Sequence, residues 1–321
     1  MTVTLGHGTS RRDITDLLVS WTWSGDAASV CRQLTGEMVC EEDSGLPLPA
    51  LGDRVAMEEA GERLFEGVVL LRSLGSEDKT LSFTAYDYGF YLQRNDGTFR
   101  FTGAPPEEIT RLVCASREVP VAALPATGVP IRRKFAGVGL SEIIRTAWSL
   151  AGERNGKVYA IRYTPAGLLV KERREDGAGL VLRGGSNLMD AATREDASRM
   201  VNSAAIYDRS GNLIRRTGDT ESQRLYGVME RHIPSGEDAE ARARRVLEEG
   251  RLQRTVTVNV LGDTSLLTGE TVVVREERTG LSGVFWIDAD VHTWKRRQYY
   301  SRLTLNCRNV MGFAGAGSED L

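Results

Sequence analysis

Three side chains near the end of the sequence could bind a divalent metal ion. Asp288, Asp290 and His292 alternate along a segment with the pattern of a β-strand, and alternate residues of a strand share one face. Carboxylate oxygens and imidazole nitrogens are ligands for such ions. The sequence has only three histidines and offers no identifiable fourth ligand. We therefore favour a solvent-facing strand edge, on which these side chains pair with the basic residues at 295–297, and predict no metal site.

Motifs of the common enzyme classes are missing from the sequence. The glycine-rich stretches 135–141 and 183–187 lack both the lysine of a phosphate-binding loop and the glycine order of a dinucleotide fingerprint. Neither a GxSxG nucleophile elbow nor an HExxH zinc helix occurs. Adjacent carboxylates such as Glu276 and Glu277 would face opposite sides of a strand. We predict that the protein is not an enzyme and that it needs no cofactor.

Two tryptophans could anchor a subunit interface. Trp21 and Trp23 lie two residues apart in VSWTWSGD and therefore share one face of a strand. Packing in the core is the default interpretation. An interface is the alternative, because aromatic anchors are enriched at interface centres.

The four cysteines are predicted to be buried free thiols. Cys31, Cys40, Cys114 and Cys307 show no CxxC spacing and lie in segments with strand or helix patterns. Free cysteine behaves as a small hydrophobic residue.

The composition is that of a globular protein with two or three domains. The chain has 321 residues, of which 41% are hydrophobic and 26% charged. Its net charge of −3 creates no strong field toward nucleic acid or anionic membranes. No apolar run approaches the ~18 residues of a membrane span, and the start lacks the apolar region of a signal peptide. We expect no sequence-specific nucleic-acid binding, no membrane insertion, and synthesis and retention in the cytoplasm.

Strand patterns dominate the sequence and predict a mainly β fold with an α+β insertion. The clearest strands are 80–87, 255–261, 270–277 and 283–291. Within 255–261 the valines alternate with polar residues, which predicts a sheet with one wet face. Three helices are predicted, one after the proline pair 105–106, one over 141–152 and one over 235–250.

Turn signals divide the chain into consecutive regions. We predict a first tube-like β-barrel over 1–103, a mixed α/β middle domain over 104–196, a second tube-like β-barrel with one helix over 197–309, and a flexible C-terminal tail over 310–321.

The two β-rich regions share a pattern of residues. In each, a glycine and an acidic residue open one strand, and a second glycine opens the next. The residues are Gly52, Asp53 and Gly67 in the first region, and Gly269, Glu270 and Gly283 in the second. Chance could produce this pattern, and so could duplication. If it is duplication, a ring of such subunits would show twice its true symmetry, and a trimer would look like a hexamer.

An ordered series of segments resembles a known family. The segments are ITDLLVSWTWSGD (14–26), GDRV (52–55), LFEGVVLLRS (64–73), TLSFTAYDYGFYLQRND (80–96), MVNSAAIYDRSGN (200–212), YGVMERHI (226–233) and GVFWIDADVHTWKRRQYYSRLTL (283–305). The chain resembles the XkdQ and YqbQ family of PBSX-type prophage tail proteins, which is similar to the central baseplate hub proteins of contractile-tailed phages and tailocins. It departs from the usual pattern at 295–298, where KRRQ replaces a glycine turn.

The resemblance implies a structural function. It implies a hub of three subunits with two tube-like barrels each, forming a pseudo-sixfold ring between the sixfold tail tube and the threefold spike. Partners would be further copies of the chain, a tail tube or tube-initiator protein, a spike or LysM-containing tail protein, and baseplate wedge proteins. The location would be a virion or tailocin tail assembled in the host cytoplasm. Two alternatives are a peripheral baseplate or receptor-binding protein and a cell-wall-degrading tail enzyme.

Overall fold

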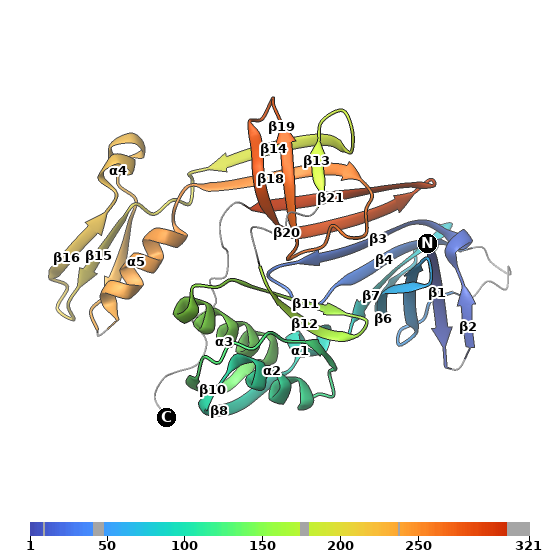
Figure 1. The fold of residues 1–321 in the computed structure, drawn as a ribbon, viewed down its shortest axis with the longest axis horizontal. Helices are drawn as coiled ribbons and strands as arrows, with labels where there is room; N and C mark the ends of the chain where they lie inside the picture. Colours follow the sequence, from blue (N-terminus) through green and yellow to red (C-terminus); the bar gives the residue numbers. More distant parts are fainter. Residues whose placement is uncertain (9, 41–47, 174–179, 237, 307–321) are drawn as a thin grey trace. The chain divides into compact units, whose positions relative to one another are not determined.

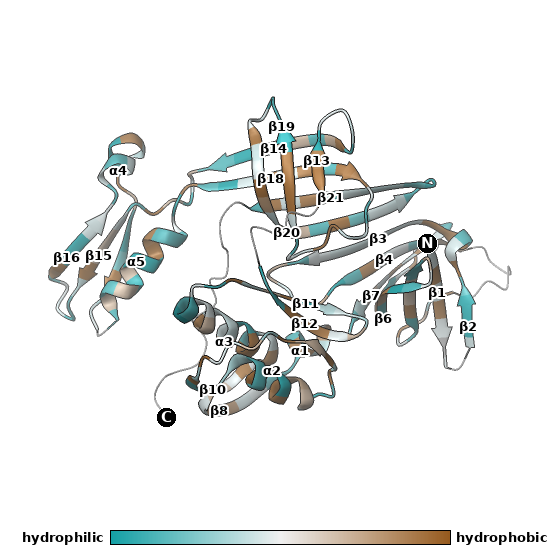
Figure 2. Ribbon diagram, viewed as in Figure 1, coloured by the Kyte–Doolittle hydropathy of each residue, from teal (hydrophilic) through white to brown (hydrophobic). Residues whose placement is uncertain are grey.

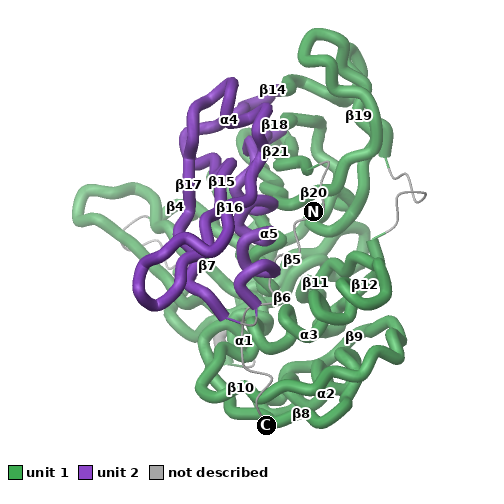
Figure 3. The backbone as a smooth tube through the Cα atoms, turned by 90° about the vertical axis from the view of Figure 1, so that its left-hand side faces the viewer, with its two compact units in different colours: residues 1–191, 257–321 green, residues 192–256 purple. Residues whose placement is uncertain are grey.

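The computed structural model divides the chain into two compact units. The described residues are 1–8, 10–40, 48–173, 180–236 and 238–306, so Cys307 and the predicted tail over 310–321 lie outside them. One unit comprises residues 1–191 and 257–321, and the other comprises residues 192–256 (Figure 3). This division differs from the three consecutive domains predicted above.

One large sheet runs through both terminal regions of the chain (Figure 1). Its strand order is β14-β18-β21-β20-β3-β4-β7-β6-β5-β1-β2, and β19 joins β20 and β13. The bounds are β1 Thr2–His7, β2 Ser10–Asp13, β3 Leu18–Asp26, β4 Gln33–Val39, β5 Arg54–Glu59, β6 Glu62–Ser73, β7 Thr80–Asp87, β13 Val181–Arg183, β14 Leu188–Asp196, β18 Gln253–Leu261, β19 Thr271–Glu276, β20 Leu281–Lys295 and β21 Gln298–Asn306; the 3-10 turn η1 spans Thr15–Leu17. The mainly β fold is confirmed. The two regions predicted to form separate tube-like β-barrels share this one sheet among the described residues.

Alternation of apolar residues explains how these strands pack. Val256, Val258 and Val260 of β18 are all buried, as the period of two predicted. On β7, Leu81 and Phe83 are buried in the same way. Figure 2 shows apolar residues along the strands near β19. The alternating apolar residues of these strands therefore contribute to the core.

The middle of the chain forms a helix-covered layer with its own core. It contains α1 Phe90–Arg94, β8 Asp96–Ala104, α2 Pro106–Ala115, β9 Val121–Ala123, β10 Ile131–Gly139, α3 Leu140–Asn155, β11 Tyr159–Thr164 and β12 Gly167–Glu172. Pro106 starts α2, as predicted, and α3 ends at Gly156 with a left-handed φ of 71°. The Trp148 indole N–H donates to Thr110 Oγ1 at 2.9 Å, which joins α3 to α2.

The second unit is a small three-stranded sheet with two helices. Strands β15 Ser203–Tyr207, β16 Leu213–Gly218 and β17 Glu230–Pro234 pair in the order β16-β15-β17. Helix α5, Ala239–Glu249, packs Ala239 and Ala243 against Ile206 and Ile233; it is the helix predicted over 235–250. The Asp219 carboxylate caps α4, Thr220–Tyr226, by accepting two backbone N–H groups.

Two of the predicted buried thiols are buried. Cys31 and Cys114 lie in the core, whereas Cys40 is half-buried, and all three are free. Burial raises the pKa of Cys31 to about 11 and that of Cys114 to about 12, so both stay protonated at neutral pH. Within the described ranges, no helix has the length and apolarity needed to span a bilayer.

The hairpin between β20 and β21 closes without a glycine. Lys295 pairs with Gln298, and the two residues between them, Arg296 and Arg297, have φ values of 52° and 61°. Two-residue hairpins favour positive φ at both positions, which asparagine and glycine adopt most readily. The arginines therefore hold a strained turn.

We expect the double substitution Arg296→Asn and Arg297→Gly to raise the free energy of unfolding by about 1–2 kcal/mol, because it relieves this strain. Urea unfolding measures the change. The control Lys295→Asn alters a neighbouring exposed residue in strand conformation and should bring no gain. An unchanged or lower stability of the double variant would contradict the strained turn.

Candidate assembly interface

The first β-rich region turns at Gly52 through three backbone hydrogen bonds. Gly52 has a φ of 90°, and its N–H donates to the Val69 carbonyl at 2.9 Å. The Asp53 N–H donates to Ala50 at 3.1 Å, and the Val69 N–H donates to the Asp53 carbonyl at 2.8 Å. The turn thereby fixes the start of β5 against β6.

The second β-rich region repeats this turn at Gly269. Gly269 also has a φ of 90°, and its N–H donates to the Ile287 carbonyl at 2.9 Å. The Glu270 N–H donates to Leu267 at 2.9 Å, and the Ile287 N–H donates to the Glu270 carbonyl at 2.9 Å. The two turns match bond for bond, so Val69 corresponds to Ile287.

The strands that follow also match. A register shift lies between Val69 and Leu71 in the β6–β7 ladder, and another lies between Ile287 and Ala289 in the β20–β21 ladder. Each shift is one extra residue directly after the corresponding position, as in a β-bulge.

The same correspondence extends to five strands in each region. In chain order, β3, β4, β5, β6 and β7 lie in the sheet as β3-β4-β7-β6-β5. The strands β14, β18, β19, β20 and β21 lie as β14-β18-β21-β20-β19. We name these two sets the first and second five-strand units.

The register corrects one part of the expected correspondence. Gly67 pairs with Val55, whereas Val272, which corresponds to Val55, pairs with Phe285. Gly67 thus corresponds to Phe285 and not to Gly283. Two residues separate β5 from β6 and four separate β19 from β20. A bulge between Met57 and Glu58 in the β5–β6 ladder offsets one of the two additional residues, so the second region has one more residue before this position. A Cβ on Gly67 would lie 2.4 Å from the Tyr86 carbonyl oxygen, so close packing requires glycine there.

The two five-strand units are joined where β20 pairs with β3. This antiparallel ladder places Asp290 opposite Gly25 and His292 opposite Trp23. Beside it, Arg32 Nη1 donates to Asp290 Oδ1 at 3.0 Å, and Arg32 Nη2 donates to Asp290 Oδ2. Both side chains are almost fully buried. We call this β20–β3 ladder, with the Arg32–Asp290 pair, the internal seam.

Asp290 is held in its charged form. The backbone N–H and the hydroxyl of Thr268 both donate to Asp290 Oδ1 at 2.6 Å. Burial alone would raise the pKa of Asp290, but the charge of Arg32 and hydrogen bonds from His292 and Arg32 outweigh it and hold the pKa well below its usual range. The carboxylate therefore stays ionised throughout the neutral range.

His292 completes the buried polar cluster. Its Nε2 lies 3.2 Å from Asp290 Oδ2 and 3.1 Å from the Leu266 carbonyl oxygen, which are both acceptors. Its Nδ1 lies 2.8 Å from the Tyr299 hydroxyl and 3.0 Å from Ser301 Oγ, which can both donate. The two acceptors beside Nε2 indicate that this nitrogen carries a proton.

The metal-ligand candidates are therefore placed otherwise than expected. Asp290 and His292 are fully buried, so the expectation of a solvent-facing edge is wrong. Asp288 is the extra residue of the bulge, which removes the strict alternation, and it binds Asn306 Nδ2 at 2.9 Å and Arg173 at 3.5 Å. Among the described residues, no group of three or more His, Cys, Asp or Glu side chains could hold a metal ion.

The two tryptophans lie at the internal seam. Trp21 stacks on Trp294 with ring centroids 5.6 Å apart, and Trp294 stacks on Tyr299 at 4.2 Å. Trp23 is buried, and the Arg32 guanidinium carbon lies 4.1 Å from its ring centroid. Both tryptophans therefore join the two five-strand units within one chain. Arg32 and Trp294 were missed by the sequence analysis, because only the partner strands identify them.

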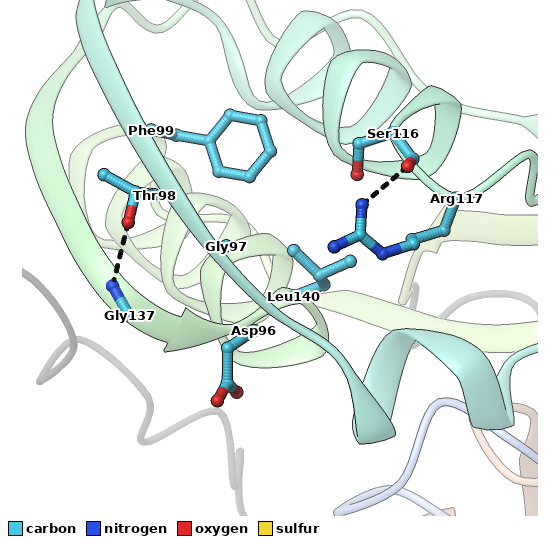
Figure 4. A pocket seen from close by; sticks show the side chains of 8 residues that line it. All are labelled: Asp96, Gly97, Thr98, Phe99, Ser116, Arg117, Gly137 and Leu140. Atoms are coloured by element: carbon cyan, nitrogen blue, oxygen red, sulfur yellow. Dashed lines mark hydrogen bonds between the residues drawn. The ribbon is translucent and has the colours of Figure 1, made fainter.

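A shallow depression of about 410 Å³ lies in the middle region (Figure 4). Its walls come from β8, β10, the start of α3 and the end of α2. Thr98 Oγ1 accepts the Gly137 N–H at 3.2 Å, and Arg117 donates to the Ser116 carbonyl. Asp96 supplies the single carboxylate of its lining, so the carboxylate pair of a glycosidase is not formed there.

The fold is that of phage tail proteins. The structure matches the 43 kDa tail protein of prophage MuSo2 from Shewanella oneidensis with a TM-score of 0.73 and 15% identity, covering 95% of this chain and 98% of that one. It also matches the Escherichia coli c3393 protein, a type VI secretion component described as structurally similar to the T4 tail proteins gp27 and gp5. That match has a TM-score of 0.54 and 10% identity, and covers 94% and 75% of the two chains.

Sequence comparison identifies the family. The model of the YQBQ-like family matches residues 21–306, and the chain belongs to this family. The phage-like element PBSX protein XkdQ of Bacillus subtilis strain 168 is 23% identical over 276 residues, which are 81% of this chain and 83% of XkdQ. The predicted family resemblance is confirmed.

Removal of one partner of the buried ion pair should be costly. Asp290→Asn leaves the Arg32 charge buried without its counter-ion, so we expect a loss of about 3–5 kcal/mol in the free energy of unfolding, measured with urea. The control Glu172→Gln breaks a partly exposed pair with Lys157 and should cost less than about 1 kcal/mol. Similar losses in the two variants would show that the internal seam is not specially sensitive.

The contribution of Asp290 should depend on pH in a defined direction. The folded-state pKa lies below that of the unfolded chain, so the stabilisation is present above about pH 4 and is lost as the pH falls through the folded-state value. The stability difference between the wild type and Asp290→Asn should shrink as the pH falls below about 4. Unfolding curves at several acidic pH values measure it, and a difference that does not shrink in acid would contradict this assignment.

Proposed function

We propose that the protein is a hub subunit of a phage-like tail baseplate, in which three copies form a pseudo-sixfold ring between a sixfold tail tube and a threefold spike. The observation that carries the proposal is the pair of five-strand units with the same strand order and the same turn at Gly52 and Gly269. Three chains with two such units present six similar units around a ring.

The relatives support a structural function in a tail. Each reported neighbour with a printed function belongs to a phage tail, a phage-like element or a secretion system likened to tail proteins. For this chain we propose, as partners, a tail tube or tube-initiator protein, a spike or LysM-containing tail protein, and baseplate wedge proteins. The site of action would be the tail of a virion or a tailocin, assembled in the host cytoplasm, and no catalytic step would be required.

The buried polar cluster suits such a function better than catalysis. Asp290 has a strongly shifted pKa, as residues of active sites often do. Both Asp290 and His292 are nevertheless fully buried, and their polar atoms are occupied by Arg32, Thr268 and neighbouring groups. No substrate could reach them without unfolding of the seam. Their effect is to fix how the two five-strand units meet.

Native mass spectrometry of the chain, co-expressed with the proteins encoded beside it, tests the proposal. We expect a complex with three copies of this chain per spike trimer. The control is Arg242→Ala, which loses one exposed side-chain contact to the Pro234 carbonyl within residues 192–256. It should leave the stoichiometry unchanged. Six copies per complex, or single copies attached at the tail periphery, would contradict the hub.

A further inference from the structure

The internal seam shows how one five-strand unit pairs with the next. β19 pairs with β20 only up to Trp286. Beyond the bulge, from Ala289 onward, the same edge of β20 pairs with β3. The ladder begins with Ala289 opposite Asp26 and continues with Asp290 opposite Gly25 and Val291 opposite Ser24. The first strand of one unit is thus the neighbour of the fourth strand of the other.

The first five-strand unit has the equivalent edge on β6. Since Val69 corresponds to Ile287, residues 71–73 correspond to 289–291. Residues 71–73 pair with β7 on one side, while β5 pairs with β6 only up to Val68. Their other side therefore carries no ladder within the described chain, and all three side chains are exposed. Leu71 is 57% exposed, and Leu70 and Leu74 beside it in the chain are 38% and 45% exposed, so several apolar side chains are exposed together at this edge.

The second five-strand unit has the equivalent of β3 on β14. Ser20 Oγ donates to Glu37 at 3.2 Å in the first five-strand unit, and Asn259 Nδ2 donates to Asp190 at 3.3 Å in the second five-strand unit. The Cys40 N–H donates to the Lys79 carbonyl, and the Gly262 N–H donates to the Tyr299 carbonyl, so Glu37 and Asn259, each three residues earlier, correspond. The two side-chain bonds therefore place Asp190 at the position of Ser20.

The far end of β14 follows the same correspondence. Asp26 Oδ1 accepts the N–H two residues later at 2.6 Å, and Asp196 Oδ1 accepts the Ser198 N–H at 2.9 Å. Residues 194–196 therefore correspond to 24–26. In the sheet order of the described chain, β14 is a terminal strand beside β18, so its outer edge is open to a further strand.

We propose that residues 71–73 of one copy pair antiparallel with residues 194–196 of a second copy. The inference rests on the proposed function, because only a ring of copies brings these edges together three times. Its register follows the internal seam. Leu71 lies opposite the partner's Asp196, Arg72 opposite the partner's Glu195, and Ser73 opposite the partner's Arg194.

Charge supports this register. At the internal seam, the carboxylate of Asp290 meets the guanidinium of Arg32, and Gly25 leaves room for it, since a Cβ there would lie 2.3 Å from Arg32 Nη1. In the second five-strand unit the acidic residue lies on β14 itself. It is Glu195, whose Oε1 lies 3.8 Å from Arg254 Nε. Across the proposed pairing between two copies, Arg72 would add a second positive charge, besides Arg254, beside the partner's Glu195. Opposite charges would then face each other.

Cysteine pairs test the register directly. In a Cys40→Ser, Cys307→Ser background, Ser73→Cys with Arg194→Cys places two thiols opposite each other, at the Cα spacing of an antiparallel pair, which a disulfide can bridge. After oxidation of the full chain, co-expressed with its tail neighbours, we expect covalent trimers on a denaturing gel. The matched control, Ser73→Cys with Thr193→Cys, points its thiols to opposite faces and should give monomers.

The outcomes separate the seam from the hub. Trimers by native mass spectrometry without cross-links, or equal cross-linking of the control pair, would overturn the seam and leave the hub standing. Absence of any trimer would overturn both.

Charge reversal gives a second readout independent of the thiols. Arg72→Glu should weaken association at least tenfold, and Glu195→Arg in the same chain should restore it; no restoration would contradict the proposed pairing of these two residues.

Discussion

The pairing of β20 with β3 is the interaction on which the rest of the main sheet depends. It joins strands from the two ends of the chain, and its ion pair links residues 258 positions apart. Such a contact gains no help from local structure and carries a high loop-closure cost. The buried Arg32–Asp290 pair makes a wrong register unfavourable, since any shift would leave a buried charge without its partner.

The additional parts of the chain are inserted at connections of the repeated unit. In the first five-strand unit, six residues connect β3 to β4, whereas in the second the connection from β14 to β18 holds β15, β16, β17, α4 and α5. The helix-covered middle region lies between the two units in the chain. Insertions at such connections leave the strand ladders unchanged. In the proposed hub, the repeated sheet would form the ring, and the inserted parts would be free to contact other tail proteins.

Part of this structure was predictable from local patterns. Alternation identified β7, β18, β19 and β20, and the glycine-acid pairs at 52–53 and 269–270 marked turns that share three backbone hydrogen bonds. Gly67 and Gly283 were wrongly matched as equivalent positions. Gly67 is required by close packing, whereas Gly283 adopts a φ of 142° at a position with space for a Cβ. Register depends on bulges and turn lengths, which composition does not encode.

The buried cluster could not be predicted for a different reason. Asp290 and His292 have the spacing of exposed strand residues, and their burial comes from β3 and from Arg32, far away in sequence. The bulge at Asp288 also breaks the alternation on which a three-ligand site would depend. Alternation along the sequence identifies a strand. Which of its polar residues are buried depends on the neighbouring strand.

The most direct measurement is a cryo-electron microscopy reconstruction of the tail end, calculated without imposed symmetry. We predict three copies of this chain in one closed ring, with six five-strand units that alternate between first and second and superpose on one another. A ring of six chains, or a chain whose two five-strand units do not both face the ring axis, would contradict the account.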